Sequence, residues 1–214
     1  QPLYAITNYA AACQNAMQPG SERLRTQLPQ WIKEIETQAR RAAAIISKLG
    51  NFVRKSASQR STIDLNRLLI ESLDLLRLEA RSHQVRVGLE LATPAPLVLG
   101  DRVQIEQVFV NLLRNAFDAL EFVSAGERRV AVKTQRTSDH VSVHVEDCGK
   151  GLSADEMPLL FEPFFTTKQR GMGMGLAISR SIIEAHGGRL WATRNVLAGI
   201  TVHFELPVDT ADTA

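Results

Sequence analysis

Two stretches near the start of the chain have the apolar spacing of amphipathic helices. The first runs from Leu3 to Met17, with an apolar residue at every third or fourth position. The run Gln18-Pro19-Gly20-Ser21 interrupts this pattern, and a second stripe then continues from Leu28 to Val53. Alternating steps of four and three over such a length are typical of a coiled-coil seam. The pattern predicts an antiparallel helical hairpin over residues 1–57.

A hairpin of this kind has one long apolar stripe to bury. Two helices cannot cover such a stripe on both sides, so pairing with a second copy into a four-helix bundle would complete the core. The alternative is that the hairpin packs against the rest of its own chain. We expect a homodimer formed through the hairpin.

The pattern changes after residue 57. Residues 58–62 are polar and are predicted to be a linker, residues 63–208 a second domain, and residues 209–214 a disordered tail. In the second domain, helical periodicity predicts a helix capped by Asp64 that runs to about Arg81. Further helices are predicted over residues 101–121, briefly from residue 153, and over 175–186.

Alternation of apolar and polar residues predicts the strands of this domain. They fall at residues 85–91, 128–136, 140–147, 189–194 and 200–206. Helices and strands are too irregularly interleaved for a doubly wound parallel fold. The expected class is therefore α+β, a mixed sheet covered on one face by helices.

Composition adds a few limits to this picture. The 25 basic and 23 acidic residues nearly balance, so we expect neither nucleic acid nor a membrane surface as a main partner. Cys13 and Cys148 lack CxxC spacing, which argues against a disulfide framework or a zinc site and fits a reducing compartment. No apolar run approaches the roughly 20 residues that cross a bilayer. A cytoplasmic location is expected, with membrane anchoring of a longer parent left open.

The helix predicted from Asp101 carries a row of polar side chains. Asn111, Asn115 and Asp118 are spaced by four and three residues, which places them on one face. An asparagine oxygen is a neutral hard ligand, suited to Mg²⁺ that phosphates already hold. A pair of asparagines bonded between two packed helices would explain the same spacing.

The segment VEDCGKGL places Asp147 at the end of a strand, followed by Gly149 and Gly151. Alternate glycines let the backbone turn sharply and let a flat ligand approach closely. The carboxylate of Asp147 can then accept a hydrogen bond from an exocyclic amine such as adenine N6. An ordinary junction between a strand and a turn has the same pattern.

Two later segments are rich in residues that bind phosphate. The run FEPFFTTK follows phenylalanines with Thr167 and Lys168, whose hydroxyl and ammonium can donate to a phosphate. Behind it, glycines that precede a helix leave backbone N–H groups free at the helix start. These glycines are Gly171, Gly173 and Gly175. A buried loop with a solvated lysine is the alternative, and the glycine run matches neither a P-loop nor a dinucleotide fingerprint.

In their order, these segments resemble the motifs of bacterial two-component sensor histidine kinases. NLLRNAFDA is similar to the N box, DCGKG to the first glycine box, FEPFFTTK to the F box and GMGMGLAIS to the second glycine box. QPLYAITNYA and ARRAAAIISKLGNFVR resemble the two helices of the dimerisation and phosphotransfer domain. SIIEAHGGRLWA is most similar to the oxygen-sensing nitrogen-fixation and dicarboxylate-sensing kinases. The resemblance implies an α/β sandwich ATPase domain of the Bergerat type.

The resemblance also implies roles for individual residues. Asn115 would coordinate Mg²⁺, Asp147 would read adenine, and Lys168 would approach the terminal phosphate of ATP. Asn115 and Lys168 would thus serve catalysis. Further nucleotide contacts, the base pocket and a short lid are implied for Asn111, Asp118, Gly149, Gly151, Thr167, Gly171, Gly173, Gly175, Leu176 and Thr201. The last of these lies in GITVHFELP, which resembles the last strand of the same domain.

The accepting histidine is expected outside this sequence. In the oxygen-sensing and dicarboxylate-sensing subfamily, H-E-x-N usually comes directly before Q-P-L, which would place that histidine four residues before Gln1. None of the histidines present is expected to substitute for it, namely His83, His140, His144, His186 and His203. The chain is then expected to bind ATP and Mg²⁺ but not to phosphorylate itself, while the parent passes the phosphoryl group to a response regulator.

Two other functions are compatible with parts of the pattern. One is another ATPase of the same superfold, such as a chaperone, topoisomerase or mismatch-repair type, which usually has a glutamate where Asn111 stands. The other is a nucleotide-sensing dimer module without catalysis.

Overall fold

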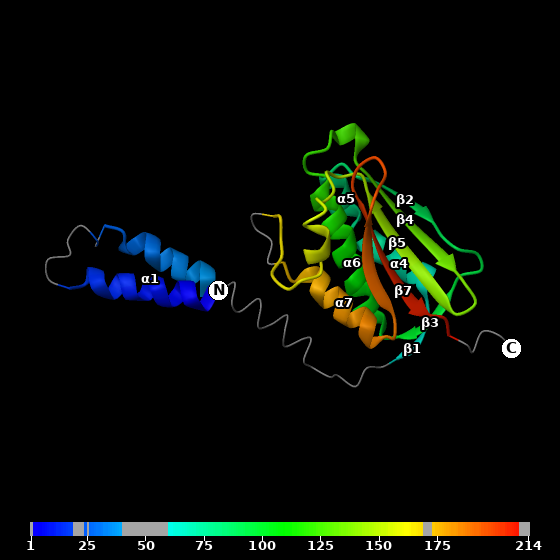
Figure 1. The fold of residues 1–214 in the computed structure, drawn as a ribbon, viewed down its shortest axis with the longest axis horizontal. Coiled ribbons are helices and arrows are strands. Elements are labelled where there is room, and N and C mark those ends of the chain that lie inside the picture. The colour runs from blue at the N-terminus through cyan, green and yellow to red at the C-terminus, as the bar shows by residue number, and fades with distance from the viewer. Residues whose placement is uncertain (1, 19–23, 25, 40–59, 169–172, 210–214) are drawn as a thin grey trace. The chain divides into compact units, whose positions relative to one another are not determined.

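The computed structural model describes residues 2–18, 24, 26–39, 60–168 and 173–209 (Figure 1). The chain divides into two compact units, Gln1–Ala57 and Ser58–Ala214. Each unit is described by itself.

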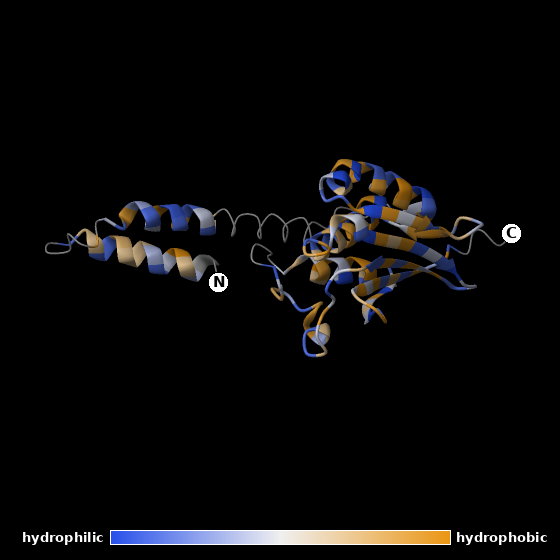
Figure 2. Ribbon diagram, turned by 90° about the horizontal axis from the view of Figure 1, so that it is seen from above, coloured by the Kyte–Doolittle hydropathy of each residue, from blue (hydrophilic) through white to orange (hydrophobic). Residues whose placement is uncertain are grey.

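The first unit contains two helical stretches. Helix α1 spans Pro2–Ala16, and residues 28–39 form the second stretch. The two stretches run side by side in Figures 1 and 2. The part of the predicted seam beyond residue 39 lies outside the described residues. Within the described part, Ile32 on the seam is 59% exposed in the single chain.

The second unit is built on a five-stranded sheet in the order β2-β4-β5-β7-β6. The strands are β2 (Arg86–Glu90), β4 (Arg129–Arg136), β5 (His140–Asp147), β6 (Arg189–Arg194) and β7 (Ile200–Pro207). β2 and β4 are parallel and the other neighbours are antiparallel. The mixed sheet and the α+β class predicted from the sequence are confirmed.

Helices cover one face of this sheet, as Figure 1 shows. They are α4 (Leu65–Leu75), α6 (Arg102–Ala119) and α7 (Gly175–Ala185). Alternate residues of β5 and β7 point into the core beneath them, and the strands change hydropathy residue by residue in Figure 2. Val143 and Phe204, paired across these two strands, are fully buried. Period-two alternation therefore decides which sheet face meets the helices.

A second, two-stranded sheet was not predicted. β1 (Ser61–Asp64) pairs antiparallel with β3 (Leu97–Gly100). Ser61 and Thr62 thus belong to a strand and not to the expected linker over 58–62. Asp209, expected in a disordered tail, donates its N–H to Leu97 O at 2.9 Å and accepts from Thr62 Oγ1 at 2.7 Å. Backbone pairing orders these segments, and such pairing leaves no periodicity in a short sequence. Residues 210–214 lie outside the described residues.

Side-chain caps start both long helices where the sequence predicted. Asp64 accepts from Arg67 N at 2.9 Å, and Asp101 accepts from Val103 N at 3.0 Å. The first predicted helix is nevertheless two helices, because α4 ends at Leu75 and α5 spans Arg77–Ser82. The apolar spacing runs through this break, so the pattern could not reveal it.

The short helix predicted from Ser153 is only a capped turn followed by the 3₁₀ helix η2 (Met157–Leu159). Ser153 N donates to Glu156 Oε2 at 2.8 Å, and Glu156 N donates to Ser153 Oγ at 3.2 Å. This reciprocal pair is a capping box. Pro158 follows at once and has no N–H for an α-helical bond, so the helix does not continue.

Candidate nucleotide-binding site

Asp147 is a buried carboxylate at the end of β5. Its side chain lies on the helix-covered face and the residue is only 5% exposed. Oδ1 accepts from Gly149 N at 2.8 Å. Burial raises the pKa of Asp147 to about 6, while backbone hydrogen bonds from Gly149 and Ile200 oppose this rise. Near neutral pH the group is a fixed, partly desolvated acceptor, suited to a neutral N–H donor.

Close backbone approaches surround Asp147. A Cβ added at Gly149 would lie 2.6 Å from Ala119 O at the end of α6. A Cβ added at Gly199, whose φ is +86°, would lie 2.0 Å from Asp147 O. Glycine is therefore required at both positions. Gly151 lies beside Gly199, with its Cβ position 3.2 Å from Gly199 O. The sharp turn predicted from the sequence agrees with this geometry, and the close approach of a flat ligand stays a prediction.

Thr201 does not fit the predicted contact with the nucleotide. In the antiparallel register of β5 and β7 it pairs with Glu146, so its side chain points to the sheet face opposite Asp147. Its hydroxyl donates to Asn195 Oδ1 at 2.7 Å. Ile200 is the strand residue whose N–H bonds Asp147. Because neighbouring residues of a strand lie on opposite faces, a difference of one position changes the face.

Asn195 was missed in the sequence. It lies in the turn between β6 and β7, and its Nδ2 donates to Asp147 O at 2.8 Å. Turn asparagines are common. The only available signal was its place four residues before Gly199, which did not point to Asp147.

Asn111 and Asn115 have different partners, although they share one face of α6. Asn111 Nδ2 donates to Ser179 Oγ on α7 at 3.0 Å. A Cβ added at Gly175, the first residue of α7, would lie 2.5 Å from Asn111 Oδ1. Asn111 thus joins two helices, as the alternative interpretation of the spacing allowed, and borders the start of α7.

Asn115 and Asp118 together hold a cation, the ammonium of Lys168. Lys168 Nζ donates to Asn115 Oδ1 at 3.0 Å and to Asp118 Oδ2 at 2.6 Å. In chemical terms, the ammonium stands for any cation that these two oxygens can bind. The side chains of Lys168 and Asp118 are 38% and 47% exposed, so water screens the pair.

The FEPFFTTK loop is tied to the start of α7. Phe164 N donates to Gly173 O at 2.8 Å. The side chain of Phe164 remains 65% exposed. Thr167 is exposed, and Leu176 packs against the core from the first turn of α7. Gly171 lies outside the described residues.

These residues fit Mg²⁺ carried by phosphates better than a metal held by protein alone. Within the described ranges, no cluster of three or more His, Cys, Asp or Glu side chains could hold a metal ion. Mg²⁺ bound with a nucleotide needs few protein ligands, because phosphates and water fill most positions. Asn115 Oδ1 would be such a ligand, since it already accepts from a cation, and Asp118 would add negative charge beside it.

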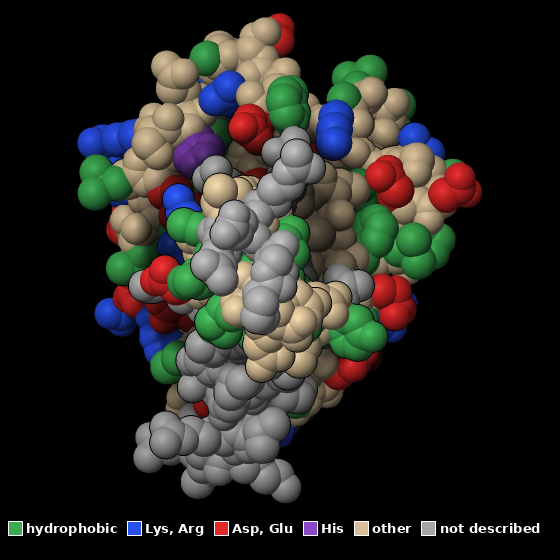
Figure 3. Space-filling view, turned by 90° about the vertical axis from the view of Figure 1, so that its left-hand side faces the viewer, with side chains coloured by type: hydrophobic (Ala, Val, Ile, Leu, Met, Phe, Trp, Pro, Cys, Tyr) green, Lys and Arg blue, Asp and Glu red, His purple; other side chains and the backbone are tan. Residues whose placement is uncertain are grey.

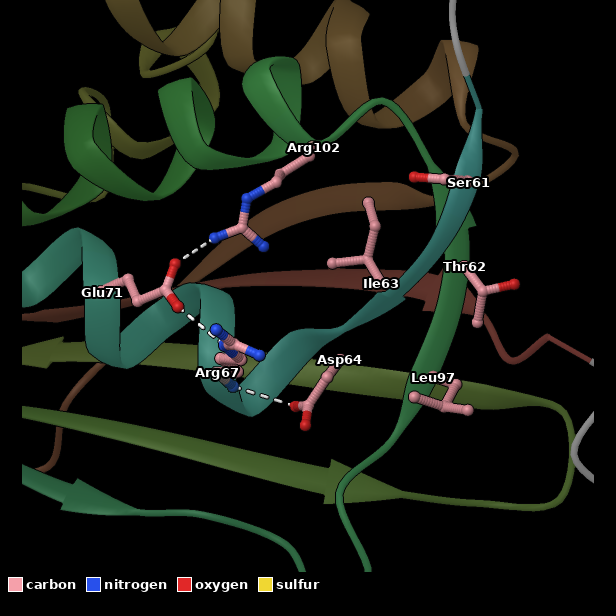
Figure 4. Close-up of a pocket in the computed structure, with 8 residues that line it drawn as sticks. All are labelled: Ser61, Thr62, Ile63, Asp64, Arg67, Glu71, Leu97 and Arg102. Carbon is pink, nitrogen blue, oxygen red and sulfur yellow. Dashed lines mark hydrogen bonds and ion pairs between the residues drawn. The ribbon is translucent and has the colours of Figure 1, made fainter.

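A cavity of about 570 Å³ lies elsewhere in the second unit (Figure 4). Glu71 joins two arginines there, bonding Arg67 at 2.8 Å and also Arg102. The hydrogen bond from Arg67 holds the pKa of Glu71 below its ordinary value. Because the charges offset one another, this cavity has no excess of positive charge for a nucleotide. Its lining shares no residue with the site above: Ser61, Thr62, Ile63, Asp64, Arg67, Glu71, Leu97 and Arg102.

Charges are also intermixed on the molecular surface. On the face drawn in Figure 3, basic and acidic side chains alternate with hydrophobic ones. No helix among the described residues combines the length and the apolar character that crossing a membrane requires.

The family of this domain follows from comparison with known proteins. Residues 100–210 match the model of the histidine kinase-, DNA gyrase B- and HSP90-like ATPases. The chain therefore belongs to this ATPase family, and the resemblance to sensor histidine kinases is confirmed by its relatives.

Among these relatives is the sensor protein FixL of Bradyrhizobium diazoefficiens, 42% identical over 97% of this chain and 41% of FixL. The C4-dicarboxylate transport sensor protein DctS of Rhodobacter capsulatus is 38% identical over 97% of this chain and 32% of DctS. The chain thus spans less than half the length of either relative.

Solved structures of histidine kinase ThkA share the fold. Its catalytic domain is 31% identical, with a TM-score of 0.63 over 70% of this chain and 95% of that chain. ThkA in complex with the response regulator protein TrrA is 23% identical, with a TM-score of 0.69 over 99% of this chain and 59% of that chain.

Proposed function

We propose that the second unit binds ATP with Mg²⁺, with the base at Asp147 and the phosphates between α6 and the loop that ends in Lys168. The observation that carries this proposal is the buried Asp147 carboxylate, which has its backbone donors fixed and forms no ion pair within the described residues. A neutral amine such as adenine N6 would satisfy it with little loss of solvation, because the group is already buried.

Helix α6 would align the two ends of the nucleotide. The loop after Asp147 touches α6 at Ala119, and Asn115 lies one turn earlier. At 1.5 Å per residue, four residues of helix cover about 6 Å along the axis. Asn111 lies a further turn away and contacts the start of α7. Successive turns of α6 would thus lie beside the base, the metal ion and the phosphates of the nucleotide.

Each remaining residue would have a role in binding or charge neutralisation. Mg²⁺ would neutralise the phosphates when bound, with Asn115 as its protein ligand. Lys168 would turn from Asp118 toward the terminal phosphate. Gly149 and Gly151 would line the base. The phosphate end would be closed by Thr167, Gly171, Gly173, Gly175 and Leu176.

We further propose that the parent protein is a sensor histidine kinase that phosphorylates a histidine and then a response-regulator aspartate. In the first step a histidine nitrogen attacks the γ-phosphorus, a P–N bond forms, and the bond to the ADP oxygen breaks. The similarity to FixL and DctS supports this proposal, as does the complex of ThkA with TrrA. Positioning and charge neutralisation would supply most of the catalysis.

The accepting histidine is proposed to precede Gln1 in an H-E-x-N run. Every histidine of this chain lies in the second unit. The ring of His186 is held between Ile182 O, 2.7 Å from Nδ1, and Asp101 N, 3.0 Å from Nε2. His144 and His203 bond each other through Nδ1 at 2.6 Å. The rings of these three histidines are thus engaged in structural hydrogen bonds.

Labelled ATP tests this function. Incubated with Mg²⁺, the chain should bind nucleotide but form no acid-labile, base-stable phosphate. A separate helical hairpin that contains the upstream H-E-x-N run should become labelled when it is added. Stable phosphohistidine on the chain itself would contradict the placement of the acceptor. If neither the hairpin nor an added receiver domain becomes labelled with phosphate, the result would favour a nucleotide-sensing module without catalysis.

The first unit is proposed to form the four-helix bundle of a homodimer. The exposure of Ile32 on the predicted seam supports this, because a second copy would cover it. Light scattering over a range of concentrations should give a dimer for the chain. Ile32→Glu should weaken the dimer because it places a charge in the interface, whereas Lys33→Glu, next to it but off the seam, should not. A monomer at tens of micromolar would contradict the proposal.

A further inference from the structure

Asn195 makes a set of hydrogen bonds that fixes the orientation of its amide. Nδ2 donates to Asp147 O at 2.8 Å and to Ala198 O at 3.3 Å. Both acceptors are backbone carbonyl oxygens, which cannot donate. The amide nitrogen must therefore face them, and Oδ1 must face the other way.

Thr201 completes this arrangement. Its hydroxyl lies 2.7 Å from Asn195 Oδ1 and donates to it. Thr201 is only 8% exposed and Asn195 is half-buried, so this bond is partly shielded from water. The backbone N–H of Asn195 also donates to Gly199 O at 3.2 Å, which closes the turn between β6 and β7. The position of the amide is thus determined from three sides.

Asn195 bonds Asp147 just beyond the end of the hydrogen-bond ladder between β5 and β7. The ladder between β5 and β7 ends at the pair Glu146 and Thr201, one residue before Asp147. Beyond that pair, Gly199 passes so close that an added Cβ would lie 2.0 Å from Asp147 O. Asn195 supplies the hydrogen bond that this carbonyl would otherwise lack from β7.

We infer that Asn195 is a positioning residue for base selection by Asp147, and that Thr201 orients it. Asn195 holds the backbone of Asp147, and the carboxylate is then aimed by its own bonds from Gly149 and Ile200. The inference rests on the proposed function, in which Asp147 binds a 6-aminopurine. Its consequence is discrimination between purines that carry the exocyclic amine and purines that lack it.

The test compares ATP with purine riboside triphosphate, which has the same phosphates but no 6-amino group. Both are titrated into the whole chain with Mg²⁺ by calorimetry. Asn195→Ala should lower the affinity for ATP about three- to tenfold, the effect of one hydrogen bond, and leave that for purine riboside triphosphate unchanged. Thr201→Val should have a smaller effect in the same direction. Equal losses for both nucleotides, or an unchanged ratio, would overturn the inference.

Thr137→Ala is a matched control. Thr137 also bonds the backbone of a hairpin turn, since its Oγ1 donates to His140 O at 3.0 Å. That turn joins β4 to β5 at the opposite end of β5 from Asp147. The ratio of the two affinities should not change in this variant. If Asn195→Ala does not fold, Thr201→Val decides, because it keeps the size of the side chain, and a wild-type ratio there would overturn the inference.

Asp147→Asn in the same assay separates the two claims. If this variant keeps the wild-type preference for ATP, the assignment of the base to Asp147 fails, and the role of Asn195 fails with it. If Asp147→Asn loses the preference while Asn195→Ala keeps it, only the role of Asn195 fails.

Discussion

The two ends of the candidate site are built in opposite ways. At the base end, Asp147 is 5% exposed and backbone donors hold its carboxylate. At the phosphate end, Lys168 and Asp118 form an ion pair whose side chains are 38% and 47% exposed. In the proposed binding mode, Asp147 would accept the base without moving, whereas Lys168 would have to leave Asp118 to reach a phosphate.

Moving the charged group costs less free energy at the phosphate end than at the base end. An exposed ion pair contributes only about 0–1 kcal/mol, so Lys168 can leave Asp118 at small cost. Moving a buried carboxylate would break hydrogen bonds away from water, where each unsatisfied group costs about 1–3 kcal/mol. In the proposed binding mode, selectivity for the base would therefore come from the fixed end, and the response to phosphate and metal from the adjustable end.

The largest effect is expected from crowding the fixed end. Gly199→Ala adds a Cβ 2.0 Å from Asp147 O at a residue with φ of +86°. Strain and overpacking together should cost about 2–4 kcal/mol of unfolding free energy. Gly88→Ala is the control, because nothing lies within 4 Å of its Cβ position. Urea unfolding that gives the two variants equal stability would contradict the close packing at Asp147.

A smaller effect is expected from changing the adjustable end. Lys168→Met should weaken ATP binding by about 1–2 kcal/mol, roughly five- to thirtyfold, and ADP binding much less, because only ATP has the terminal phosphate. Stability should change by less than about 1 kcal/mol. Lys133→Met breaks a comparable pair with Glu90 on the sheet and should leave binding unchanged. If Lys168→Met lost equal affinity for ATP and ADP, the proposed contact of Lys168 with the terminal phosphate would be wrong.

The preference for ATP should depend on pH through Asp147. The carboxylate accepts from the amine more strongly than the protonated acid does, because its charge assists the hydrogen bond, and burial raises the pKa of Asp147 to about 6. The ratio of ATP affinity to purine riboside triphosphate affinity should therefore rise from pH 5.5 to pH 7, by at most about fourfold. Taking the ratio cancels the titration of the phosphates. A ratio independent of pH would show that Asp147 does not bind the base through its charge.

A further prediction concerns His203, on the sheet face away from the helices, whose contribution to stability depends on pH with the opposite sign to that of Asp147. Burial, helped by His144, lowers the pKa of His203 from 6.5 to about 4. The stabilisation from neutral His203 is present above pH 6.5 and is lost as the pH falls through about 4. Asp147 acts oppositely, since its raised pKa favours the fold at low pH and this contribution is lost as the pH rises through about 6.

The free energy of unfolding, measured between pH 4.5 and pH 7, can separate the contributions of His203 and Asp147. His203→Gln should flatten or reverse the rise of stability with pH, whereas Asp147→Asn should steepen it. Identical profiles for the two variants would mean that neither group carries its shifted pKa.

Periodicity and caps made much of the fold predictable. β5 and β6 have the predicted bounds, and Asp64 and Asp101 cap their helices, because these features depend on neighbours in the sequence. The pair β1 and β3 was missed because its four-residue strands are ordered by each other.

The candidate site was predictable as a set of residues but less so as an arrangement. Residue types indicated Asp147, Asn115 and Lys168; the structure brings Lys168 to Asn115 on α6 and the glycine turn after Asp147 to the end of the same helix. The face of Thr201 depends on the register between two strands, and the bond from Asn195 to Asp147 spans 48 residues. Neither leaves a local signal in a single sequence.

The proposed function depends above all on binding of the adenine base by Asp147. Calorimetric titration with a non-hydrolysable ATP analogue and Mg²⁺ measures this contact directly. Asp147→Asn keeps the shape of the side chain, removes its charge and presents a donor to the donor of adenine. We expect Asp147→Asn to lose about 1.5–3 kcal/mol of nucleotide-binding free energy, roughly ten- to a hundredfold in affinity. Equal affinities of the variant and the unchanged chain would contradict it.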